Sequence, residues 1–297
     1  MTFDQLLQNL ANGISLGALY ALIAIGYTMV YGILRLINFA HGDIVMIGAY
    51  AAFYGVAMFL LPWWLAFPLA ILVTTGVGVI IERVAYRPLR EFPRINLFTS
   101  AVAASFLLEN LANVVFGGRP KAFQRPAFMD SMLSIGNSKV VSYTPIIIIT
   151  ALVLFAGLLY IVNRTKVGMA MRALSKDIET TGLMGINTDR IILVSFILGS
   201  ALAAAGGILW AIKFPQINPL MGVMPGLKAF IAAVLGGIGN ITGAVIGGFL
   251  LGLVEIMVLA FFPELSGYRD AFAYTILILL LLFRPTGIMG EMQAEKV

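Results

Sequence analysis

The sequence predicts an all-α polytopic membrane protein with eight or nine transmembrane helices, one of them a broken or half helix near 225–238. Two observations lead to this prediction. Sixty per cent of the 297 residues are hydrophobic and only 11% are charged, whereas soluble globular proteins average about 25% charged residues. The uncharged runs are also long and continuous, unlike the short alternating segments of a β-barrel. We expect residues 1–297 to form a single membrane domain.

The composition also limits the chemistry. The chain has no cysteine and one histidine, which excludes disulfides and cysteine nucleophiles and argues against a metal site. The net charge of +5 is modest, so nucleic acid is not expected as a partner. Residues 1–9 contain no Lys or Arg, so we expect the first apolar run to be a retained membrane helix and not a signal peptide.

The first three membrane helices follow from two uncharged stretches. Residues 5–34 allow one span near 11–34, and residues 44–81 are long enough for two, since a span needs about 20 residues. Pro62-Trp63-Trp64 lies in the middle of the second stretch. Proline ends a helix and tryptophan favours the membrane interface, so we predict a tight hairpin there.

The later membrane helices follow from shorter apolar runs, which cover residues 96–117, 140–163, 191–212, 229–254 and 271–283. Lys228 to Ile238 is too short for a full span at about 1.5 Å per residue. Glycines at 236, 237 and 239 also break this run early. We therefore expect a half helix at this point.

Two interpretations of the glycine-rich segment remain open and are compatible. The glycines recur at a spacing typical of close helix packing: Gly236, Gly237, Gly239, Gly243, Gly247 and Gly248. Irregular backbone at membrane depth also occurs where it lines a cavity or a transport path. Gly236, Gly237 and Asn240 are therefore candidates for such a path.

Basic residues predict the orientation, because cytoplasmic loops are enriched in Lys and Arg. With a periplasmic N-terminus and a cytoplasmic C-terminus, twelve of the 19 Lys and Arg residues fall on the cytoplasmic side, including Lys296. Seven fall outside, including Lys228. The segment 117–144 is the main exception, because it places basic residues outside.

Two acidic residues interrupt the predicted membrane helices. A charge at a helix centre costs roughly 2.5–3.5 kcal/mol on insertion scales, so Glu109 and Glu255 need a partner or water. Asn113 follows Glu109 by four residues and shares its helix face. These three residues are candidates for a pore lining or a gate, and the alternative is an interhelical hydrogen bond that fixes packing. No chain of intramembrane acids accompanies them, which argues against proton-driven transport.

A polar cluster, Asn38-Phe-Ala-His-Gly-Asp43, stands at the predicted start of the second span. Asn38 can cap this helix, and Asp43 can offset the positive end of its dipole. Asn38 and His41 are also candidates for a cytoplasmic gate or a partner contact.

The segment 163–190 mixes charge with spaced apolar residues and is predicted to be a cytoplasmic loop. Met171, Leu174 and Ile178 share one face of a single short helix. This helix is a solvated connector, a helix on the bilayer surface or a docking element for another protein. Residues suited to end it or to cap the next span follow: Gly182 or Gly185, then Asn187 or Thr188.

Four stretches resemble the permeases of branched-chain amino acid ABC importers, and most closely the LivH-type subunit. They are Asn38-Phe-Ala-His-Gly-Asp43, Met171-Arg-Ala-Leu-Ser-Lys-Asp-Ile-Glu179 with Gly182 and Gly185-Ile-Asn-Thr-Asp-Arg190, Ala232-Ala-Val-Leu-Gly-Gly-Ile-Gly-Asn240 with Gly243-Ala-Val-Ile-Gly-Gly248, and Arg284-Pro-Thr-Gly287.

The resemblance implies a bundle like that of type II ABC importers, in a bacterial inner membrane. It implies four kinds of partner: a second homologous permease subunit in a heterodimer, two cytoplasmic ATPases that bind ATP-Mg, a periplasmic substrate-binding protein and the lipid bilayer. It implies no cofactor bound by this chain. The region from Glu179 to Gly185 is implied to dock on an ATPase, although Thr180 and Thr181 stand where the family signature has two alanines.

This chain does not itself hydrolyse ATP, because it has no Walker A loop. Gly222, Gly226 and Lys228 are the nearest approach, and their spacing fails. Two other functions are alternatives. One is an ion-coupled secondary transporter that uses Glu109 or Glu255. The other is an intramembrane enzyme, against which the absence of cysteines and the absence of paired intramembrane acids argue. Among ABC permeases, one for urea or short amides is the alternative.

Overall fold

The computed structural model describes residues 2–135 and 138–290, so Lys296 of the charge count lies outside the described residues. Within the described residues, nine longer helices form the bundle: α1 (Phe3–Leu34), α2 (His41–Ala57), α3 (Trp63–Ile81), α4 (Arg94–Phe116), α5 (Tyr143–Arg164), α8 (Thr188–Lys213), α9 (Val223–Gly236), α10 (Ile241–Phe261) and α11 (Arg269–Phe283). Two short helices, α6 (Lys166–Lys176) and α7 (Ile178–Leu183), lie between α5 and α8. A π-helical turn (Glu82–Tyr86) extends α3.

Four short strands complete the described chain as two antiparallel pairs. β1 (Lys121–Ala122) pairs with β4 (Gln216–Ile217), and β2 (Met132–Ile135) pairs with β3 (Ser138–Val141). The sequence analysis did not predict these pairs. The hairpin predicted at Pro62 is confirmed, because this residue is the N-cap of α3.

Among the described residues, seven helical segments are long and apolar enough to cross a membrane. The shorter apolar helix α9 and the 17-residue α2 are not among these seven. The 14 residues of α9 extend about 21 Å at 1.5 Å per residue, less than the hydrocarbon thickness of about 30 Å. The predicted all-α membrane bundle with a half helix near 225–238 is therefore confirmed.

The first helix occupies the centre of the bundle. It begins with a capping box, in which Thr2 and Gln5 exchange side-chain to backbone hydrogen bonds. Of its most apolar window, 94% is buried, compared with 11% in α4. The helices α5, α8, α9 and α10 pack directly against it. The outer helices, in contrast, leave large apolar side chains exposed, as lipid contact requires.

Glycines allow α1, α9 and α10 to pack closely. A Cβ atom at Gly17 would lie 2.7 Å from the Cα of Phe249, and one at Gly248 would lie 2.6 Å from the Cα of Ala21. Backbones this close leave no room for a side chain. The packing interpretation of the glycine pattern is therefore confirmed.

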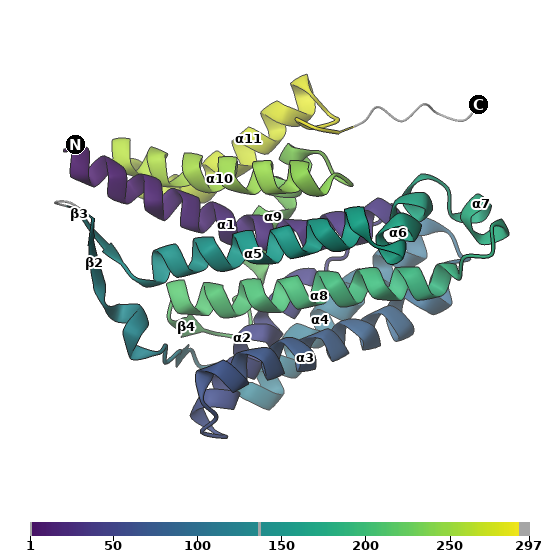
Figure 1. Ribbon diagram of the computed structural model, residues 1–297, viewed down its shortest axis with the longest axis horizontal. Helices are drawn as coiled ribbons and strands as arrows, with labels where there is room; N and C mark the ends of the chain where they lie inside the picture. Colours follow the sequence, from purple (N-terminus) through teal and green to yellow (C-terminus); the bar gives the residue numbers. More distant parts are fainter. Residues whose placement is uncertain (1, 136–137, 291–297) are drawn as a thin grey trace.

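The bundle has two distinct ends (Figure 1). The N-terminus of α1 and the β2–β3 hairpin lie at one end, which we call the N-terminal end, and α6 and α7 lie at the other, which we call the α7 end. The predicted loop 163–190 thus forms the two short helices of the α7 end.

Candidate functional site

Both gate candidates at the start of α2 are buried. Asn38 and His41 are each 1% exposed. The Tyr86 hydroxyl donates to Asn38 Oδ1 at 3.0 Å. His41 Nε2 lies 3.1 Å from the Ile23 carbonyl oxygen, and its ring centroid is 4.6 Å from that of Tyr27. His41 is a core residue in this chain, so the suggested partner contact is wrong.

The predicted capping role of Asn38 is also wrong. Ala40 is the N-cap residue of α2, and no side chain caps it, because the Asn38 side chain turns to Tyr86. Asp43 does lie in the first turn of α2. Its buried carboxylate accepts a hydrogen bond from Ser105 of α4 at 2.5 Å. The cluster therefore ties α2 to α4 and to the turn after α3.

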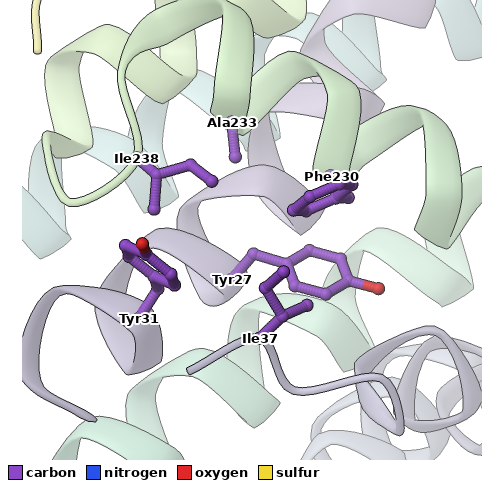
Figure 2. Close-up of a pocket in the computed structure, with 6 residues that line it drawn as sticks. All are labelled: Tyr27, Tyr31, Ile37, Phe230, Ala233 and Ile238. Carbon is purple, nitrogen blue, oxygen red and sulfur yellow. The ribbon is translucent and has the colours of Figure 1, made fainter. Parts of the chain in front are cut away.

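A small crevice lies between α1, the segment before α2 and the half helix α9 (Figure 2). Its lining is mostly aromatic and aliphatic: Tyr27, Tyr31, Ile37, Phe230, Ala233 and Ile238. The half helix presents Phe230 and Ala233 to this crevice, and Phe230 meets the edge of Tyr27 with centroids 6.2 Å apart.

Gly236, Gly237 and Asn240 form a tight junction between α9 and α10. Gly237 has φ of +104°, a conformation that favours glycine. Asn240 caps α10 by accepting from the Gly243 N–H at 3.0 Å, and its Nδ2 donates to the Met289 carbonyl at 3.0 Å. These contacts are structural, and a path-lining role for the three residues stays a prediction.

Asn110 and Asn113, in the second half of α4, are more exposed than Ser105. Asn113 is exposed, and Glu109 is half-buried. Asn110 is exposed and donates to the Phe106 carbonyl at 2.7 Å. Lipid does not solvate such groups, so this face requires protein or water beside it. We expected these side chains to face the interior of the bundle or water. Asn110 and Asn113 instead lie on the surface of this chain, outside its core.

Glu255 lies in a buried charge cluster of α1, α9, α10 and α11. Lys228 Nζ is 2.6 Å from Glu255 Oε1 and 2.6 Å from Asp270 Oδ1. Arg269 also pairs with Glu255, and the Tyr20 hydroxyl donates to Glu255 Oε2 at 2.8 Å. The two cations balance the two anions, which supports the packing interpretation of Glu255. The placement of Lys228 in an outside loop is wrong, because Lys228 is buried within α9.

The single helix predicted for Met171, Leu174 and Ile178 is wrong. The backbone of Asp177 is extended, with φ of −156° and ψ of 113°, and its side chain caps a second helix, α7. Met171 and Leu174 lie on α6 and are 6% and 1% exposed. Both are therefore core residues that no partner reaches, and Ile178 belongs to the other helix.

Exposed apolar residues of this region lie on α6, at Val167 and Met169, and on and just after α7. Ile178 is 42% exposed, Leu183 is 83% and Met184 is 78%. Glu179 and Gly182 are exposed on the same helix. Gly185, with φ of +79°, ends it as predicted.

A second charge cluster joins the start of α8 to the turn after α3. Asp189, in the first turn of α8, lies 2.7 Å from Arg90 Nη1 and 2.8 Å from Arg87 Nη2. Arg90 also pairs with the buried Glu82. Burial lowers the pKa of Arg90, and Asp189 opposes this effect. The sequence analysis missed this cluster, although the four arginines of 83–96 were a usable signal.

Comparison with known proteins identifies the chain. Residues 9–281 match the family described as the permease component of branched-chain amino acid transport systems. The chain belongs to this family. It is 45% identical to the permease protein BraD of Pseudomonas aeruginosa over 98% of each chain, and 41% identical to LivH of Escherichia coli K12 over 99% of each. The protein is thus a multi-pass permease component of a transporter and not an enzyme.

The solved structure of PsaBC from Streptococcus pneumoniae in complex with Fab aligns with 95% of this permease and 92% of that chain, at 12% identity and a TM-score of 0.48. The family assignment rests on the sequence matches and not on this alignment.

Proposed function

We propose that this permease is a translocation subunit of an ATP-driven importer, which moves branched-chain, hydrophobic amino acids from a periplasmic binding protein into the cytoplasm. The observation that carries the proposal is its identity of 45% with BraD and 41% with LivH over nearly the whole chain. Both are named high-affinity branched-chain amino acid transport system permease proteins. The whole chain acts as one membrane domain.

The substrate path runs along the exposed face of α4, beside a second homologous permease subunit. This placement is supported by Glu109 and Asn113, whose polar atoms need a neighbour other than lipid. An amino acid crosses as a zwitterion with an aliphatic side chain. Polar groups beside exposed Leu107 and Leu111 match both parts of such a substrate.

The α7 end is the docking site for two cytoplasmic ATPases, one on each permease subunit. A helix that presents Ile178, Leu183 and Met184 suits a groove in a partner, and Glu179 at its start can meet a basic residue at the rim. The ATPases bind ATP-Mg, and this chain binds no cofactor. Gly182 and Gly185 let the chain turn back into α8.

The N-terminal end faces the periplasm and the α7 end faces the cytoplasm of a bacterial cell. The charge distribution supports this orientation, because the segments 34–43, 83–96 and 163–190 carry ten of the 19 Lys and Arg residues. The α7 end and the cytoplasmic ATPases then lie on the same side of the membrane.

The function is tested on the complete complex of this chain, the second permease, the ATPases and the binding protein. We expect leucine, isoleucine and valine to bind the binding protein, and the loaded protein to stimulate ATP hydrolysis. Lysine and glutamate serve as charged controls. Stimulation by urea or acetamide instead would change the substrate class. Hydrolysis that responds to none of these ligands would contradict the importer.

A further inference from the structure

Polar contacts connect the first turn of α8, the helix against which α7 packs, to the interior of the bundle. α7 packs against the start of α8, where Asp189 binds Arg87 and Arg90. Arg90, whose side chain is only 13% exposed, reaches the buried Glu82. Movement of α7 therefore acts first on a charge pair and then on a buried carboxylate.

The next step is the π-helical turn that begins at Glu82. This turn ends at Tyr86, which is fully buried and donates its hydroxyl hydrogen to Asn38 Oδ1 at 3.0 Å. π-Helical turns inside α-helices are rare and occur frequently at functional sites. One short turn thus carries both the acceptor for Arg90 and the donor for Asn38.

A second contact reaches the same segment from α6. Arg35 Nη2 donates to the Ser175 carbonyl at 2.8 Å. Ser175 lies two residues before Asp177, the N-cap residue of α7. Arg35 has φ of +54°, a left-handed conformation that is costly for a residue other than glycine. Both series of contacts meet in the segment 35–41, which connects α1 to α2 and contributes Ile37 to the crevice beside α9.

We propose that Asp189, Arg90 and Tyr86 are positioning residues that pass movement of α7 to the segment 35–41, and so couple ATP hydrolysis to opening of the permease at the α7 end. This inference rests on the proposed function, because it requires an ATPase that moves α7. A network of contacts does not by itself prove coupling, so the test measures coupling directly.

The test uses the complete complex in vesicles, with ATP hydrolysis and leucine uptake measured on the same sample. Tyr86→Phe removes one hydroxyl and keeps the buried ring, and its matched control is Tyr50→Phe, since the Tyr50 hydroxyl is also buried but has no hydrogen-bond partner among the described residues. Asp189→Asn weakens the arginine contacts, and its control is Asp130→Asn, which changes an ion pair with Arg125 at 2.5 Å.

Each test variant is expected to lower the leucine taken up per ATP hydrolysed by about fivefold, the value of one hydrogen bond of average strength. The controls should match the wild type, and ATPase co-purification should not change. Because both residues act in one series, the double variant should lose little more than either single variant.

An unchanged ratio in both test variants overturns the inference, as does a loss that appears only as a smaller amount of assembled complex. Additive losses in the double variant also contradict a single series. If the wild-type complex itself shows no ATP-dependent uptake, the proposed function fails, and the proposed coupling through Asp189, Arg90 and Tyr86 fails with it.

Discussion

Two acidic side chains in the membrane helices of this chain have opposite surroundings. Glu255 is 3% exposed and is held by Lys228, Arg269 and Tyr20. Glu109 is half-buried on α4, one turn after Ser105. The first is compensated inside its own subunit, and the second needs a neighbour outside it. We therefore expect substitutions of Glu255 to affect folding and those of Glu109 to affect transport.

Glu255→Leu should lower the stability of the subunit by about 3–5 kcal/mol, because it removes the buried carboxylate that pairs with Lys228 and Arg269. The double variant Lys228→Met with Glu255→Leu should recover part of this loss, since both charges of the pair are removed together. Thermal unfolding of the purified complex measures the effect. Asp130→Asn, at a more exposed ion pair, is the control and should cost less than about 1 kcal/mol. An equal loss in Glu255→Leu and the control would argue against the cluster's structural role.

Glu109→Gln should reduce leucine uptake by at least about fivefold, the equivalent of one hydrogen bond, while the complex assembles normally. Gln keeps the shape of the side chain and removes its charge. Uptake by vesicles and the yield of complex are compared with those of Glu264→Gln, a change at an exposed residue outside the long helices. Normal uptake by Glu109→Gln, together with poor assembly of Glu109→Leu, would show that the residue only packs.

Single residues were the part of the site that the sequence predicted least well. Asn38 and His41 were recognised as a polar cluster, but their partners Tyr86 and Ile23 are far away in the chain, and no local pattern indicates them. Lys228 looked like a loop residue because it stands beside an uncharged run. Its partners lie 27 and 42 positions away, on two other helices.

At the level of helices, close approach is the feature that holds α1 against α10. Gly17→Ala should destabilise the subunit by about 1–3 kcal/mol, the usual cost of overpacking, because the new Cβ would lie 2.7 Å from the Cα of Phe249. Gly157→Ala on α5 is the control, since a Cβ there meets nothing within 4 Å. Melting temperatures of the two variants test this contrast. Equal values would mean that the helices separate without cost.

The helix α7 should be needed for the ATPase but not for the membrane bundle. Met184→Asp should release the ATPase during purification, because a charge enters an apolar docking surface. The second permease should still co-purify. Met132→Asp is the matched control, since Met132 is 69% exposed at the N-terminal end. Retention of the ATPase by Met184→Asp at the level of this control would place the docking site elsewhere, first at residues 83–96.

Helices were predicted well where their length and lack of charge determine their extent. They were predicted poorly where a capping residue determines where a helix begins or ends. The spans and the half helix follow from apolar runs and glycines. The break between α6 and α7 was missed, because 171, 174 and 178 fit one helical face, and the capping of Asp177 onto the Thr180 N–H at 3.1 Å was not considered. An aspartate inside a predicted short helix is a cap signal that could have found it.

Two charge clusters have different roles in the whole molecule. The charge cluster of Glu255 fixes α9, α10 and α11, and the cluster of Asp189 links the α7 end to the bundle. The placement of Lys and Arg predicted that the segments 34–43, 83–96 and 163–190 share one end, and the contacts of Arg35 with Ser175 and of Arg90 with Asp189 agree with this. Which side of the membrane this end faces stays a prediction. The strand pairs of the N-terminal end have no comparable signal in the sequence.

Uptake of leucine by vesicles that contain the complete complex tests the central claim most directly. The loaded binding protein is supplied on the side of the N-terminal end, ATP is supplied on the side of the α7 end, and ionophores remove every ion gradient. We predict that leucine accumulates under these conditions and that accumulation stops when ATP is withdrawn. Uptake that continues without ATP and disappears when the ion gradients are removed would contradict an ATP-driven importer and would favour an ion-coupled transporter.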